Sequence, residues 1–106
     1  MKTKKKTFRG KMYEFVTINE IAKGSNRSLP VIRKFIERGI LPDSNLRMPS
    51  IVTPKKEIMG ARIYTKQLAE KLCEIIKTFR QGIPVTEEQK AAINKAFNEE
   101  KTELQL

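Results

Sequence analysis

A stripe of apolar residues at helical spacing is the strongest periodic pattern in this chain. The apolar residues recur at intervals of three and four and share one face of a helix expected over residues 66–81, namely Leu68, Leu72, Ile75, Ile76 and Phe79. Thr65 suits the cap of this helix, and Gly82 and Pro84 end it. A chain of 106 residues must bury such a helix against other elements within one small domain.

Two shorter helices are expected before it, over residues 17–24 and 29–38. Thr17 and Glu20 have the spacing of a capping box at the start of the first helix. Gly39 suits the left-handed backbone that ends the second helix.

The stretch between the second and third helices carries prolines and glycines that interrupt the helical pattern. Two β-rich runs, 51–53 and 61–64, are expected to pair as a hairpin. A fourth helix is expected over residues 87–101, after a capping box formed by Thr86 and Gln89. The predicted fold class is therefore mainly α, with four helices and a small β-hairpin.

Charge is distributed unevenly along the chain. Residues 1–66 hold 16 basic and 5 acidic residues, a net charge of +11, whereas residues 67–106 hold 6 basic and 7 acidic residues, a net charge of −1. Such asymmetry favours a polyanion-binding face joined to a near-neutral segment. The alternative interpretation is a soluble basic protein that does not bind nucleic acid.

Three segments are expected. Residues 1–12 form a disordered basic arm, because their like charges repel one another and few apolar groups can be buried. This arm is either a phosphate-binding tail or a solubilising extension. Residues 13–101 form the folded domain, and residues 102–106 form a frayed tail.

Several classes of protein are excluded by residue usage. One cysteine, Cys73, and no histidine leave no internal disulfide, no Cys/His zinc site and no histidine base. There is no phosphate-cradling glycine loop and no nucleophile constellation, so neither an enzyme nor a cofactor is expected. No apolar run approaches ~20 residues, and no apolar segment follows the basic N-terminus, so we expect no membrane partner and a cytoplasmic location.

Two short helices joined by a tight turn, the second of them basic, are typical of a helix-turn-helix whose second helix enters the major groove of DNA. Three residues are placed to meet base edges, and the others to contact phosphates or a neighbouring groove. These DNA-binding candidates are Arg27, Ser28, Val31, Arg33, Lys34, Arg38, Arg47, Lys55, Lys56, Arg62 and Tyr64.

The base-edge candidates are Arg27, Ser28 and Val31. For Lys55 and Lys56 a solvated loop is the competing interpretation. Tyr64 is a further candidate with two interpretations, since it either contacts the DNA backbone or packs within the hairpin.

The order of these motifs resembles the DNA-binding domain of the MerR family. Residues 16–23 resemble its opening helix, residues 28–42 its recognition helix and the strand entry after it, and residues 60–65 the motif that closes its wing. Residues 72–83, followed by a helix that begins near Thr86, resemble its closing helix and glycine turn. The resemblance implies a winged helix-turn-helix that binds duplex DNA as a transcriptional regulator or a phage-type DNA-transaction factor.

The chain departs from the family pattern in four ways. Lys34 stands where an aromatic residue is frequent, and Arg27 stands where a small apolar residue usually seats the turn. The stretch from Pro42 to Gly60 is longer than usual. The long dimerisation helix and effector domain do not follow, which is similar to short phage or mobile-element members. A terminase small-subunit or excisionase-like accessory protein is one alternative, and a basic protein- or RNA-interaction module is another.

A homodimer through the C-terminal region is also expected. The fourth helix carries Ile93, Ala96 and Phe97, and part of this stripe must cover the third helix. If Phe97, Leu104 and Leu106 are left over, they form an apolar patch that a second copy could bury.

Overall fold

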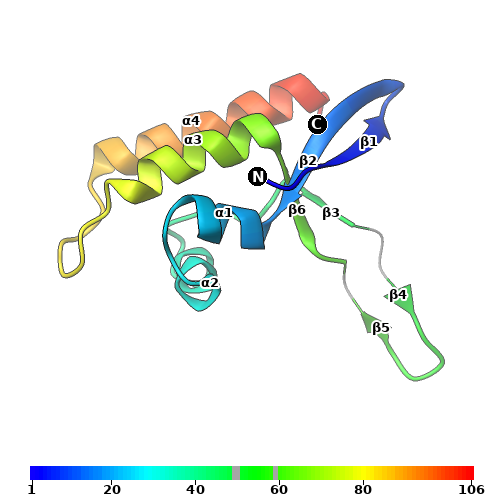
Figure 1. Cartoon of the computed structure of the whole chain (residues 1–106), viewed down its shortest axis with the longest axis horizontal. Helices are drawn as coiled ribbons and strands as arrows, with labels where there is room; N and C mark the ends of the chain where they lie inside the picture. Colours follow the sequence, from blue (N-terminus) through cyan, green and yellow to red (C-terminus); the bar gives the residue numbers. More distant parts are fainter. Residues whose placement is uncertain (49–50, 59) are drawn as a thin grey trace.

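The computed structural model describes residues 1–48, 51–58 and 60–106. Within these residues, four helices and six strands follow one another along the chain (Figure 1). Their order is β1 (Lys4–Phe8), β2 (Lys11–Thr17), α1 (Ile18–Gly24), α2 (Leu29–Glu37), β3 (Leu46–Arg47), β4 (Ile51–Val52), β5 (Glu57–Ile58), β6 (Arg62–Thr65), α3 (Lys66–Lys77) and α4 (Glu87–Leu104).

The strands form one antiparallel sheet in the order β1-β2-β6-β3 and a separate β4–β5 hairpin. In the sheet, Val16 lies opposite Tyr64 and Phe15 lies opposite Thr65. Because successive side chains of a strand point to opposite faces, Val16 and Phe15 enter different cores. Val16 joins the main core beneath the helices, and Phe15 joins a smaller cluster with Ile63 and Leu104.

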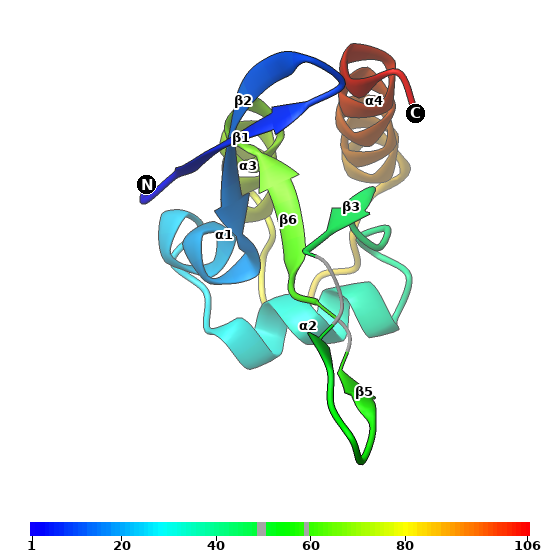
Figure 2. The ribbon, with the colours of Figure 1, turned by 90° about the vertical axis from the view of Figure 1, so that its right-hand side faces the viewer.

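Helices α1 and α3 pack against β2 and β6 of the sheet, and α3 and α4 run side by side in opposite directions (Figure 1). Figure 2 shows α2 and the β4–β5 hairpin at the opposite end of the molecule from the β1–β2 turn. The main core contains apolar side chains from α1, α2, α3 and α4. Four of them are at most 1% exposed, namely Ile21, Ile32, Leu72 and Ile93. Within the described ranges, no helix is both long and apolar enough to cross a membrane.

The helix positions agree closely with the sequence patterns, and two of the caps explain why. The Thr86 hydroxyl accepts from Gln89 N at 3.1 Å, and the Gln89 side chain accepts from Thr86 N at 2.8 Å, so this capping box is confirmed. Thr65 also caps its helix, accepting from Leu68 N at 3.3 Å.

The predicted capping box at the start of α1 is wrong. Thr17 is the N-cap residue, but its side chain makes no capping hydrogen bond. The Glu20 carboxylate instead accepts from Lys2 N at 3.2 Å. The reciprocal geometry is absent because Glu20 has a partner on the N-terminal segment, which the sequence analysis treated as disordered.

The prediction of a mainly α winged helix-turn-helix with a small hairpin is wrong. The four helices accompany a curled four-stranded antiparallel sheet, which makes the arrangement mixed α and β. Much of the difference comes from residues 1–12, which form β1 and part of β2 rather than a disordered arm. Arg9 and Gly10 both have positive φ at the turn, the geometry that a tight hairpin requires.

The predicted pairing of residues 51–53 with residues 61–64 is also wrong. Val52 pairs with Glu57 across the short β4–β5 hairpin, whereas β6 pairs with β2 and β3 in the sheet. The predicted frayed tail is likewise not observed, because α4 continues to Leu104, whose side chain is buried.

Candidate nucleic-acid interface

The outward face of α2 carries three exposed basic residues, Arg33, Lys34 and Arg38. The opposite face is held to the core by Ile32, which is 1% exposed, and by Phe35, whose ring meets that of Phe79 edge-on at 5.4 Å. Because the apolar side is anchored, the basic side is presented to solvent in a defined orientation.

Two further candidates lie at the start of α2. Ser28 is the N-cap residue, is exposed, and makes no side-chain capping bond. Val31 is half-buried in the first turn. Both residues therefore lie at the N-terminal end of the helix that carries the three exposed basic residues.

Arg27 does not occupy the position that was expected for a base-edge contact. Its guanidinium donates to Phe79 O at 2.7 Å and to Ile76 O at 3.4 Å, so it contacts one carbonyl in the last turn of α3 and one just after the helix. Arg27 Nε is buried and has no hydrogen-bond partner among the described residues. Arg27 therefore ties the α1–α2 turn to α3, and its cationic charge complements the negative end of the α3 dipole.

The turn of the β4–β5 hairpin exposes Lys55 and Lys56. Thr53 closes this turn, because Thr53 N donates to Lys56 O at 2.9 Å and Lys56 N donates to the Thr53 hydroxyl at 3.1 Å. The hydrogen bonds hold the backbone while both ammonium groups remain in solvent.

The base of the hairpin carries a three-residue ion cluster around Asp43. The Asp43 carboxylate accepts from Arg62 Nε at 2.6 Å and from an Arg47 guanidinium nitrogen at 3.3 Å. Partial burial raises the pKa of the Asp43 carboxyl, but the hydrogen bonds from Arg62, Ser44 N and Arg47 outweigh this effect and lower the pKa overall. Arg47 and Arg62 are thus already paired with a carboxylate.

Tyr64 lies in the core, not at the interface. It is 2% exposed, and its ring meets that of Phe97 edge-on at 6.3 Å. Burial raises the pKa of the Tyr64 hydroxyl to about 12. Of its two interpretations, the structure therefore supports packing within the fold.

A buried carboxylate that the sequence analysis did not select supports the hairpin base. Glu100 is 3% exposed and accepts from Thr65 N at 2.8 Å and from Asn45 Nδ2 at 3.0 Å. These bonds join α4 to the start of α3 and to the loop before β3. Its position in the apolar stripe between Ile93 and Leu104 was the available signal, because a charged residue at a core-facing position needs a buried partner.

The positive charge of residues 1–66 is divided between two regions. The β1–β2 hairpin bears one set of lysines, and α2 with the β4–β5 hairpin bears the other, at the far end of the molecule in both views (Figures 1 and 2). The single basic face that the charge count suggested is therefore two separate surfaces.

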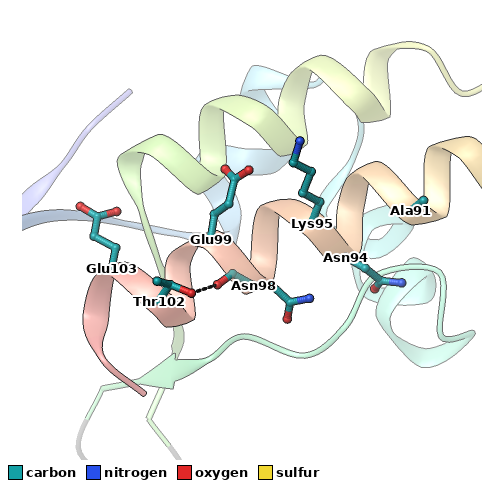
Figure 3. A pocket seen from close by; sticks show the side chains of 7 residues that line it. All are labelled: Ala91, Asn94, Lys95, Asn98, Glu99, Thr102 and Glu103. Atoms are coloured by element: carbon teal, nitrogen blue, oxygen red, sulfur yellow. Dashed lines mark hydrogen bonds between the residues drawn. The ribbon is translucent and has the colours of Figure 1, made fainter.

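The outer side of α4 is polar and of mixed charge. A shallow depression there is lined by Ala91, Asn94, Lys95, Asn98, Glu99, Thr102 and Glu103 (Figure 3). Phe97 and Leu104, which were expected to remain for a second copy, are 3% and 1% exposed within this chain. Leu106 is 51% exposed, so of the expected apolar patch only this residue is open to solvent.

The chain was compared with known protein families, curated proteins and solved structures, and no match was found. Within the described residues, no group of three or more His, Cys, Asp or Glu side chains is arranged to hold a metal ion.

Proposed function

We propose that this protein binds duplex DNA through α2 and the β4–β5 hairpin and catalyses no reaction. The observation that carries the proposal is the placement of two exposed basic groups. One lies on α2 and the other at the turn of the hairpin, and both elements lie on the lower side of the molecule in Figures 1 and 2.

In this proposal α2 enters the major groove, whose width admits an α-helix. Arg33, Lys34 and Arg38 contact phosphates on either side of the helix. Ser28, the N-cap residue of α2, and Val31, in its first turn, meet base edges.

The hairpin contacts the backbone beside a neighbouring groove. Lys55 and Lys56 supply attraction to phosphates, which positions the protein without reading sequence. Arg47 and Arg62 stabilise the base of the hairpin through Asp43, and in this role they are structural residues.

Equilibrium binding to a fluorescent duplex tests the proposal. The double substitution Arg33→Gln/Lys34→Gln is expected to weaken binding at least about tenfold at low salt, because two phosphate contacts are lost. The matched control is Lys95→Gln/Lys101→Gln, which removes the same charge from exposed positions on α4. Equal weakening by both pairs would show that net charge alone attracts DNA, and the proposed interface would be rejected.

The same assay separates the alternative classes. A duplex RNA of the same sequence competes poorly if α2 enters a DNA major groove, because the RNA major groove is narrow and deep. Equal competition by RNA would favour a basic RNA-interaction module instead.

Transcriptional regulation and an accessory role in recombination or packaging use the same interface. The number of chains bound per duplex and the proteins that assemble with the complex separate these roles. A regulator binds a short operator in a fixed stoichiometry, whereas an accessory protein assembles on DNA with an enzyme.

A further inference from the structure

A cavity of about 520 Å³ lies between β1, β2 and β6, and Phe15 and Ile63 are among its lining residues. Its walls are largely apolar and include Phe15, Ile63, Met48 and Ala61. Concave, mostly apolar cavities of roughly 300–1,000 Å³ are the usual size for small-molecule sites.

Lysines from the N-terminal strand form one side of this cavity. Lys4 and Lys6 alternate along β1, so both point to the cavity face, and Lys2 precedes them. Lys5 points to the opposite face, where it pairs in register with Glu14. Three lysines therefore line the cavity.

Lys6 is the most informative of the three lysines. It is half-buried, and its ammonium contacts the thioether sulfur of Met48 at 2.8 Å. A thioether is a weak acceptor, so this contact satisfies an ammonium poorly. Among the described residues, Lys6 makes no ion pair with a carboxylate. A half-buried cation with only a thioether partner is favourable for binding an anion.

The cavity also contains one carboxylate, that of Glu20. Its oxygens are already engaged by Lys2 N at 3.2 Å and Lys23 Nζ at 3.9 Å. The remaining charge at the cavity is positive, which selects an anionic occupant over a neutral or cationic one.

We propose that this cavity binds a small organic anion with an apolar body and one anionic headgroup. The body lies against Met48 and Ala61, above the nearly buried Phe15 and Ile63, and the headgroup accepts hydrogen bonds from Lys6 and Lys4. Stacked nucleobases fit less well, because Phe15 is 3% exposed and offers no open ring face to a base.

Decanoate at submicellar concentration is a suitable probe, measured by titration calorimetry and by amide chemical shifts of the full chain. Decanoate is expected to bind and to shift the amide signals of residues 4, 6, 15 and 63. Decanol is expected to bind at least about tenfold more weakly, because it has no carboxylate to accept a charge-assisted hydrogen bond from a lysine. Lys6→Gln is expected to weaken decanoate binding at least about tenfold. The matched control Lys5→Gln removes the same charge from the other face of the strand and is expected to leave binding unchanged.

Three outcomes would overturn the proposal. The first is decanol binding as tightly as decanoate, and the second is equal loss in Lys5→Gln and Lys6→Gln. The third is oligothymidylate displacing decanoate in a Lys6-dependent way, which would make the sheet a nucleic-acid surface. If Lys6→Gln changes the circular dichroism spectrum, a second variant, Ala61→Leu, tests the proposal instead. This substitution fills the cavity without changing a charge and is expected to abolish decanoate binding, and unchanged binding would overturn the proposal.

Discussion

Replacing Lys55 and Lys56 with alanine is expected to reduce the salt dependence of duplex binding by a calculable amount. Five exposed cations are available at the proposed interface, namely Arg33, Lys34, Arg38, Lys55 and Lys56. At about 0.9 per phosphate, they predict a slope of log K against log salt of about −4.5, and about −2.7 for the double variant. Were Arg47 and Arg62 also engaged, the slope would be about −6.3. Their pairing with Asp43 argues for the smaller value.

Fluorescence anisotropy at several salt concentrations measures both slopes. Between 50 and 200 mM salt, affinity is expected to fall about 500-fold for the unaltered chain and about 40-fold for the double variant. Specific and random duplexes should show the same change, since lysine mainly supplies phosphate attraction. A slope near zero would refute DNA binding. An unchanged slope in the variant, or an equal change in Lys95→Ala/Lys101→Ala, would refute the role of the hairpin.

Three further predictions concern stability. Arg27→Ala is expected to lower the free energy of unfolding, measured by thermal denaturation, by about 1.5–3 kcal/mol, because Phe79 O loses a charged donor. The control Arg38→Ala, at an exposed position on α2, is expected to change it by no more than about 0.5 kcal/mol. Equal effects of the two substitutions would contradict the role of Arg27. Gly24→Ala places a Cβ 2.7 Å from Cys73 Sγ and is expected to cost about 1–3 kcal/mol, with Cys73→Ala relieving part of the loss in a double-mutant cycle. The lowered pKa of Asp43 means that its carboxylate stabilises the fold above the usual value of 3.8 and that this stabilisation is lost as pH falls through the lower, folded-state pKa. The stability of Asp43→Asn should therefore lack this loss at acid pH. If the stability of the variant and of the unaltered chain depended on pH in the same way, the result would be inconsistent with the ion cluster.

The helices were predictable because their signals are local. The spacing of apolar residues and the caps at Thr65 and Thr86 depend on side chains within one or two turns, and the structure places α3 and α4 beside them. Asn26 and Gly39 also have positive φ, as their residue types indicate at the ends of α1 and α2.

The strands were harder to predict because their partners are distant in sequence. Phe15 pairs with Thr65 across 50 positions, and nothing within either segment specifies that pairing. The lysines of β1 conceal its alternation, since Lys4 and Lys6 face the cavity and Lys5 faces away although all three are the same residue. A run of like charges therefore appeared disordered until its pairing with β2 was known.

The same division applies to the candidate interface. Local spacing alone determined that Arg33, Lys34 and Arg38 lie away from the apolar side of α2, because a helix separates its faces without reference to the rest of the chain.

Only the tertiary structure decided which other cations accompany them. Arg27 is drawn to carbonyls of α3, and Arg47 and Arg62 are drawn to Asp43. The charge of a basic residue follows from its identity, but its availability depends on which acceptors the fold brings within hydrogen-bond distance, and that is a property of the folded chain.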